Sequence, residues 1–301
     1  CGGDLYKTRK CIIKSPIYHN SDIRIVNLEN PITDTDNTED KSVLFAPSDM
    51  VSVLEDLSIN FVSLANNHIQ DKGFNGLNDT ISNLNSKGIN YFGAGLSAKE
   101  ARKAYKLSES LYILSYCEKD FNYLKKVKIA TENRYGVNLL NIKNVLDDLN
   151  KLPKNSKAFL VFHWGREHVL FPPHKNIKLA KKILKHEKVI AIIGMHAHLM
   201  QGIVRSGGKN AYMCLGNFLF PNMVISPNTK IPGCVVDYSY TGESLYITKS
   251  YMKVFKKTYK KWHLINRVSL ALSYDTDEDR FSHHFFLQEN NGTNLIELYS
   301  Y

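Results

Sequence analysis

The chain has 301 residues, 43% of them hydrophobic and 23% charged, which is the balance of a globular protein long enough to bury a large core. The formal net charge is +10, and no apolar run reaches the length of a membrane-spanning helix. Because the lysines are scattered through helical stretches, we interpret most of this charge as solvated surface. The alternative is a surface for an anionic substrate, polymer or membrane.

From the start to about residue 220, apolar runs of strand length alternate with amphipathic helical patterns. Strands are expected at residues 23–28, 60–65, 89–92, 111–116, 158–162, 189–193 and 211–215. Helices are expected between them, at residues 49–57, 73–86, 141–152 and 176–186. Strands that alternate with helices in this way indicate an α/β fold with substantial parallel character.

The pattern changes after residue 240. Residues 244–250, 264–274 and 282–287 are typical of strands, with few helices between them. We therefore expect a core over residues 1–240 and a β-rich extension over residues 241–301 that packs on this core, as antiparallel sheet or a small subdomain.

Five cysteines show no CxxC spacing, which excludes a zinc-ribbon site and argues against a disulfide framework. Cys117 and Cys214 lie in apolar runs and are expected to be buried thiols. This favours a reducing compartment, and so the cytoplasm over a membrane-anchored place in the envelope. The segment from Cys1 to Asp4 looks like the end of a first strand, so we expect residues upstream of Cys1. The alternative is a lipid-modified Cys1.

Polar residues with the chemistry of metal ligands follow the apolar runs. His196 and His198 follow the run 189–193, which Gly194 interrupts, and neutral imidazole is the commonest transition-metal ligand. Other runs are ended or followed by Asp4, Glu29, Asn67, His68 and His163. Because open α/β sheets build their sites at the carboxyl ends of the strands, these side chains are expected to converge on a dinuclear metal site. Singly, each could instead be a turn residue, a cap or a hydrogen-bonded structural residue.

The spacing of these motifs is similar to that of the calcineurin-like metallophosphoesterases. The closer likeness is to their relative, the CapA family of capsule biosynthesis, which is linked to poly-γ-glutamate. The matching blocks follow the family's order and include Val26-Asn27-Leu28-Glu29, Leu64-Ala65-Asn66-Asn67-His68, His163-Trp164-Gly165-Arg166-Glu167, Gly194-Met195-His196-Ala197-His198 and Leu215-Gly216-Asn217-Phe218. The resemblance implies a metallophosphoesterase-like α/β/β/α sandwich with mixed central sheets, to which the strand patterns after residue 240 add a mostly β C-terminal part.

The resemblance also implies metal ligands. Asp4 and His198 match ligands of the first metal, and Glu29 stands where these enzymes place the bridging carboxylate. The ligands of the second metal are matched by Asn67, His163 and His196. The family pattern Asp-x-His would place a histidine at position 6, where this chain has Tyr6. If only one metal binds, we expect it on the His196 side.

Further roles follow from the same resemblance. His68 matches the histidine that assists the leaving group, and Glu167 is the second candidate for a catalytic role. Arg166 and Asn66 are candidates for contacts with an anionic substrate. His168 is close enough to this block to support a ligand.

Two functions remain open at this stage. The first is a metal-dependent hydrolase that holds one or two divalent ions (Mn, Fe or Zn). It would act on an anionic polymer such as poly-γ-glutamate or on a phosphorylated small molecule, together with the capsule biosynthesis machinery. The second is a non-catalytic polymer-binding or assembly component with a vestigial metal site, which Tyr6 favours. The Lys-rich segment 251–262 suggests nucleic acid by charge alone, so no specific nucleic-acid partner is expected. Membrane association is left open as an alternative, although this chain does not itself encode it.

Overall fold

The computed structural model describes most of the chain, namely residues 11–36, 44–119, 126–220, 223–225, 230–232, 251–253, 258–260, 263–289 and 294–300. The candidate ligand Asp4, the substituted position Tyr6 and the expected strand 244–250 lie outside the described residues. Cys117 and Cys214 are buried, as expected.

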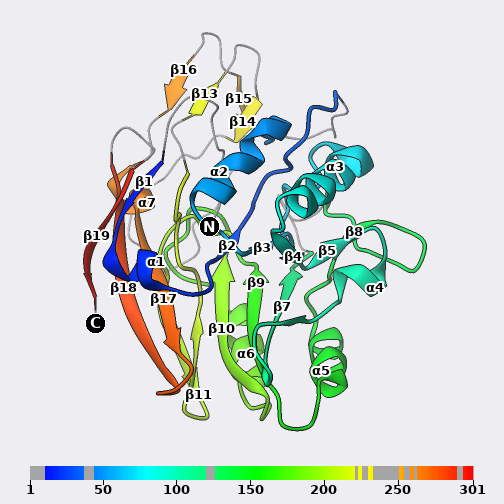
Figure 1. Ribbon diagram of the computed structural model, residues 1–301, viewed down its shortest axis with the longest axis vertical. Coiled ribbons are helices and arrows are strands. Elements are labelled where there is room, and N and C mark those ends of the chain that lie inside the picture. Colours follow the sequence, from blue (N-terminus) through cyan, green and yellow to red (C-terminus); the bar gives the residue numbers. More distant parts are fainter. Residues whose placement is uncertain are drawn as a thin grey trace.

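A six-stranded sheet forms the centre of the fold (Figure 1). Its order is β11 (Ile203–Ser206), β12 (Lys209–Tyr212), β10 (Val189–Met195), β9 (Lys157–His163), β7 (Leu111–Cys117) and β6 (Tyr105–Lys106). The four inner strands are parallel, and the two edge strands are antiparallel to their neighbours. The expected α/β fold with parallel character is confirmed.

A second, three-stranded sheet is parallel throughout. It consists of β2 (Ile25–Asn27), β3 (Phe61–Ser63) and β4 (Asn90–Phe92) in chain order. The short strand β5 (Ala94–Gly95) follows its last strand and pairs in antiparallel with β8 (Gly136–Val137), which comes after β7 in the chain. Aromatic side chains of this sheet, such as Phe61 and Phe92, share one buried cluster with Ile113 and Phe159 of the six-stranded sheet.

Helices cover the outer faces of the two sheets. The helices α5 (Ile142–Lys151) and α6 (His174–Ile183) bury their apolar sides against β7, β9 and β10. The 3-10 turn η1 (Ser48–Met50) with α2 (Val51–Asp56), and α3 (Gly73–Ser86), pack on the three-stranded sheet. A short helix, α4 (Ala98–Ala101), lies beside β5 and β8. The result is a mixed α/β arrangement with several sheets.

The C-terminal strands form a third sheet together with the start of the described chain. Its order is β1 (Ile12–Lys14), β19 (Asn294–Ser300), β18 (Arg280–Gln288) and β17 (Val268–Asp275), and only the β1–β19 pair is parallel. The expected strand 264–274 begins later than predicted, because its first residues form the short helix α7 (Leu264–Arg267). Four further short strands are β13 (Met223–Ile225), β14 (Lys230–Pro232), β15 (Tyr251–Lys253) and β16 (Thr258–Lys260).

Polar contacts tie this third sheet to the rest of the molecule. Ser15, which caps the helix α1 (Pro16–Asn20), donates to Glu297 at 2.5 Å. The N–H of Leu270 donates to the carbonyl of Leu215 at 2.8 Å. The side-chain amide of Gln288 pairs with both backbone groups of Phe220, at 2.8 and 2.7 Å. The β-rich C-terminal strands therefore rest directly on the segment that follows β12, while the division at residue 240 stays a prediction.

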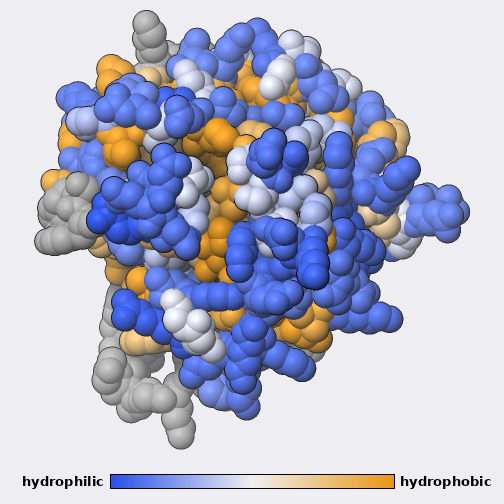
Figure 2. Space-filling view, turned by 60° about the horizontal axis from the view of Figure 1, so that its bottom comes forward, coloured by the Kyte–Doolittle hydropathy of each residue, from blue (hydrophilic) through white to orange (hydrophobic). Residues whose placement is uncertain are grey.

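The surface near the lower end of the view in Figure 1 is mostly hydrophilic, with hydrophobic residues gathered in a narrow furrow between hydrophilic ones (Figure 2). On and just after α6, exposed lysines recur at helical spacing, at Lys178, Lys181, Lys182 and Lys185. Within the described part of the chain, none of the helices has the length and apolarity needed to cross a membrane.

Candidate metal centre

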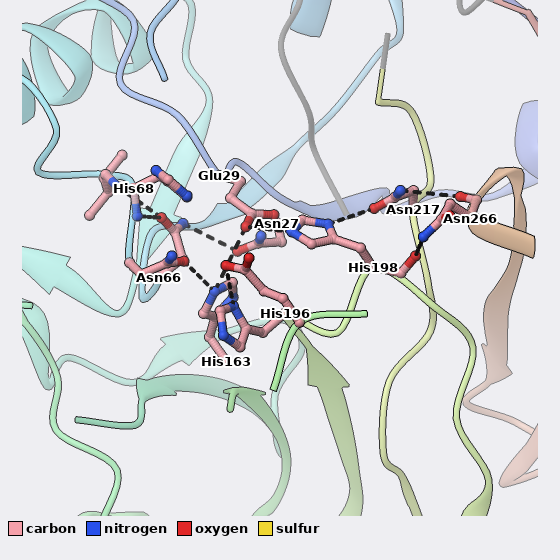
Figure 3. Close-up of polar contacts among 12 residues, drawn as sticks. Asn27, Glu29, Asn66, His68, His163, His196, His198, Asn217 and Asn266 are labelled. Atoms are coloured by element: carbon pink, nitrogen blue, oxygen red, sulfur yellow. Dashed lines mark hydrogen bonds and ion pairs between the residues drawn. The ribbon is translucent and has the colours of Figure 1, made fainter. Parts of the chain in front are cut away.

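Four parallel strands deliver the candidate ligands to one region. Glu29 follows β2, and Asn67 and His68 follow the neighbouring strand β3. His163 is the last residue of β9 and pairs with Met195, the last residue of β10, so that His196 emerges beside it. Parallel strands end at the same edge of a sheet, which brings residues from four distant parts of the sequence together. Figure 3 shows Glu29 directed toward His163 and His196.

The cluster of Glu29, His163 and His196 has the composition of a metal site. One ligand atom from each residue lies within 4.8 Å of the other two, and all three side chains are buried. Oε1 of Glu29 lies 3.9 Å from Nε2 of His163, and the rings of His163 and His196 are 4.6 Å apart between centroids. A carboxylate with two imidazoles is a ligand set that suits Zn²⁺, Mn²⁺ and Fe²⁺.

Asn67 contributes an oxygen to the same place. Its Oδ1 lies 2.7 Å from Nε2 of His163. In this arrangement the ring nitrogen carries a hydrogen and donates to the amide oxygen. When that hydrogen is lost, both atoms present lone pairs to one point, as two ligands of one ion must.

His196 is held in a form that can bind a metal. The pKa of His196 lies well below its usual value, mainly because the ring is buried. The neighbouring imidazoles of His198, His68 and His168 lower the pKa further. The ring is therefore neutral at physiological pH. Within the described residues, its Nδ1 is buried without a hydrogen-bond partner, and the nearest carboxylate oxygen, on Glu167, is 3.9 Å away. A buried nitrogen without a partner, on a neutral imidazole, is suited to bind a cation.

His198 approaches the same carboxylate from the other side. Its Nε2 lies 3.6 Å from Oε1 of Glu29, and its Nδ1 lies 2.9 Å from Oδ1 of Asn217. The same oxygen of Glu29 thus lies within 4 Å of one imidazole nitrogen on His163 and another on His198. That Glu29 bridges two cations stays a prediction. Burial lowers the pKa of His198, although Glu167 and the bond to Asn217 oppose that shift.

The backbone after β10 is unusual at both histidines. His196 has φ 96° and His198 has φ 54°, in the left-handed region that non-glycine residues rarely adopt. Such conformations persist only where the surroundings enforce them, and they cluster at functional sites. The turn therefore aims two imidazoles into the site at a cost in backbone strain.

His68 is paired with an acid that sequence reasoning missed. Its Nδ1 lies 2.6 Å from Oδ2 of Asp71, which is fully buried. Because a carboxylate can only accept, Nδ1 is the protonated nitrogen and the lone pair of the neutral ring lies on Nε2. The signal was present, because Asp71 lies three residues after His68 in the same block of sequence.

Asn66 is used to shape the turn after β3. Its Oδ1 accepts from the N–H groups of His68 and Ile69, and its Nδ2 donates to Asn27 and to the carbonyl of Leu28. The side chain is fully buried. These contacts orient the neighbouring Asn67 and His68, and a contact with substrate stays a prediction.

The remaining candidates lie at the rim. Glu167 is 11% exposed beside His196, and Arg166 is exposed. His168 stacks on His198 with 5.6 Å between ring centroids. Asn266 lies outside every sequence block that the resemblance used, and the sequence did not point to it. Asn217 lies in the block Leu215-Gly216-Asn217-Phe218, but it was given no role in the site.

Comparison with known proteins shows the family to which the chain belongs. Residues 13–222 match the family model described as "Bacterial capsule synthesis protein PGA_cap", which is more than half of the chain. The chain belongs to this capsule synthesis family. The CapA resemblance seen in the sequence motifs is thereby confirmed, and all of the described candidate residues lie inside the matched range.

Two curated relatives of the family are named for capsule biosynthesis. The "PGA biosynthesis protein CapA" of Bacillus subtilis is 29% identical over 211 residues, covering 68% of this chain and 55% of the relative. The "Capsule biosynthesis protein CapA" of Bacillus anthracis is 29% identical over 217 residues, covering 68% of this chain and 52% of the relative. The alignments therefore span about half the length of these curated relatives.

Proposed function

We propose that this chain is a metal-dependent hydrolase of the metallophosphoesterase type that acts in the synthesis or processing of an anionic capsule polymer such as poly-γ-glutamate. The observation that carries the proposal is the buried cluster of Glu29, His163 and His196. The layering of helices over two sheets supports a metallophosphoesterase-like α/β/β/α sandwich as the fold. The names of the two relatives support the polymer.

The residues that would hold one divalent ion are Glu29, Asn67, His163 and His196. His198 would serve a second ion that shares Glu29, together with Asp4. When bound, such ions activate a water molecule and neutralise charge that develops on the substrate. The chain's own contribution is a buried site in which imidazoles and one carboxylate are already placed close together.

His68 is suited to move a proton. Asp71 accepts from its Nδ1 and stabilises the ring when it becomes positively charged, as the acid does in histidine-based catalytic triads. Nε2 can then give its proton to the oxygen of a leaving group. Glu167, beside His196, is the second candidate for a catalytic role.

The substrate is expected to be anionic. Arg166 is exposed at the rim next to Glu167, and the chain carries a net charge of +10. An arginine at the rim binds phosphate or carboxylate groups through two parallel hydrogen bonds. A phosphorylated small molecule and a polyanion both meet this requirement.

The second candidate function is a polymer-binding or assembly component of capsule biosynthesis that does not hydrolyse its ligand. The observation that favours it is Tyr6, which stands where the phosphoesterase pattern has a histidine. In this case the cluster would bind an ion that only holds the fold or the polymer.

We expect the Mn²⁺-loaded protein to hydrolyse a generic phosphodiester, and the His68→Ala variant to lose about 100-fold of that rate, the lower end of what a general acid contributes. The measurement is turnover of a chromogenic phosphodiester by purified protein, with release of fragments from poly-γ-glutamate assayed in parallel. Because His68 is not a proposed ligand, the variant should retain its metal.

His174→Ala is the matched control, since this exposed histidine begins α6 and is not among the candidate site residues. Its rate should equal that of the unmodified protein. Metal-loaded protein that hydrolyses neither substrate, yet binds the polymer, would overturn the hydrolase and establish the second candidate.

A further inference from the structure

Asn266 lies far from the metal-site motifs in sequence but close to His198 in space. It belongs to α7, beyond the range 13–222 of the family model, and it is buried. Its Nδ2 donates to the backbone carbonyl of His198 at 3.0 Å, and its own carbonyl accepts from Nδ2 of Asn217 at 3.1 Å. With the 2.9 Å contact between Asn217 Oδ1 and His198 Nδ1, three residues close a triangle of hydrogen bonds (Figure 3).

The triangle determines which ring nitrogen of His198 carries hydrogen. The carbonyl of Asn266 can only accept, so the group of Asn217 that faces it is the NH₂ group. The oxygen of Asn217 then faces His198, and it too can only accept. The Nδ1 of His198 must therefore be the N–H, which leaves the lone pair of the neutral ring on Nε2, the atom that lies 3.6 Å from Glu29.

The same triangle holds the strained backbone of His198. A φ of 54° persists only where the surroundings stabilise it, and the side chain of Asn266 does so by donating a hydrogen bond to the backbone carbonyl of His198. All three residues are buried, so water cannot easily replace these bonds.

The position of Asn266 is itself fixed by the C-terminal sheet. Leu270 in β17 is bonded to Leu215, two residues before Asn217. Arg267 donates to the carbonyl of Gln288 in β18, and the side chain of Gln288 forms hydrogen bonds with both backbone groups of Phe220. The described elements after residue 263 thus hold the segment that carries Asn217 in place through these hydrogen bonds.

We propose that Asn217 and Asn266 are positioning residues for the metal centre, and that the C-terminal segment completes the centre by presetting His198 with Nε2 as its ligand atom. This inference rests on the proposed function in one respect, which is that His198 binds a metal ion. It adds that a residue outside the matched family range decides the state of a residue inside it. Outer partners of metal-bound histidines have this role in general, and they are worth about 10- to 100-fold in metal affinity.

The test uses the full chain and Zn²⁺ as the probe. We expect Asn217→Ala and Asn266→Ala each to weaken Zn²⁺ binding by about 10- to 100-fold. Because the triangle acts as a unit, the Zn²⁺ affinity of the double variant should be no more than about twofold lower than that of the single variant with the lower affinity. If the two residues contributed independently, their two losses of affinity would multiply. Asn138→Ala is the matched control, since Asn138 is also buried and also donates to a carbonyl, that of Ser115 at 3.1 Å.

The second readout needs neither metal nor activity. In metal-free protein, long-range ¹H–¹⁵N spectra should show His198 with hydrogen on Nδ1, and the Asn266→Ala variant should show a mixture of both forms. Single variants that bind Zn²⁺ as tightly as the control, or an unmodified protein with hydrogen on Nε2 of His198, would overturn the inference. Protein that binds Zn²⁺ but hydrolyses nothing would overturn only the proposed hydrolase.

Discussion

Replacing His196 with alanine is expected to weaken binding of Zn²⁺ or Mn²⁺ by well over 100-fold, more than the loss of an outer partner of a ligand would cause. The reason is that His196 supplies a neutral imidazole whose pKa is depressed mainly by burial, so it binds a cation without first losing a proton. Its removal leaves the carboxylate of Glu29, the amide oxygen of Asn67 and one imidazole, a set that holds an ion less tightly. Calorimetric titration of the metal-free variant measures the loss.

Two companion variants make that result specific. His186 is a half-buried histidine just after the end of α6, and its ring contacts Asn150 of α5. The His186→Ala variant should bind metal like the unmodified protein. Glu29→Gln keeps the shape of the buried side chain and removes its charge, so it should fold while losing the metal-induced rise in melting temperature. A His196→Ala protein that binds Zn²⁺ as tightly as His186→Ala would show that the buried cluster is not the metal centre.

Gly194→Ala is expected to destabilise the protein by about 4 kcal/mol or more, a size reached only by severe core disruptions. A Cβ at this position would lie 1.9 Å from the carbonyl oxygen of Met213 and 2.7 Å from Nε1 of Trp164. Nε1 of Trp164 donates a hydrogen bond to that carbonyl oxygen at 2.9 Å, and the carbonyl of Gly194 accepts one from the N–H of Leu215. No rotamer change relieves a clash with backbone, so β10 must move, and His196 moves with it.

Thermal unfolding and Zn²⁺ binding measure the two consequences together. The melting temperature should fall by about 10 °C, given about 2–4 °C per kcal/mol for chains of this size, and metal affinity should fall with it. Gly202→Ala is the control, because a Cβ there meets nothing within 4 Å. Equal stability of the two variants would mean that β10 and the segment at Met213 are not in close contact.

Much of the fold follows from local patterns. The parallel strands β3, β7, β9 and β10 were all predicted from their apolar runs, and the helix at Gly73–Ser86 has the predicted bounds. These predictions succeed because a buried parallel strand is apolar on both faces, whereas an amphipathic helix repeats every three to four residues. The segment 211–215 was placed too late, since β12 runs from Lys209 to Tyr212.

The C-terminal region shows where local patterns fail. The first residues of the expected strand 264–274 form the helix α7, and β19 was not predicted at all. The strand β1 pairs in parallel with β19 across nearly the whole chain. No periodicity within either segment encodes that partner, because strand pairing over such separations depends on how the intervening elements pack.

The sequence by itself determined which chemistry gathers at the edge of the sheets, since it places Glu29, Asn67, His163 and His196 directly after apolar runs that must become neighbouring parallel strands. Only the tertiary structure decided which atoms meet. It set one oxygen of Glu29 between His163 and His198. It also brought Asn266 to His198 from a segment 68 residues away. The physical reason is that hydrophobic periodicity fixes where an element ends, whereas a buried hydrogen bond depends on the packing of every element between its two partners.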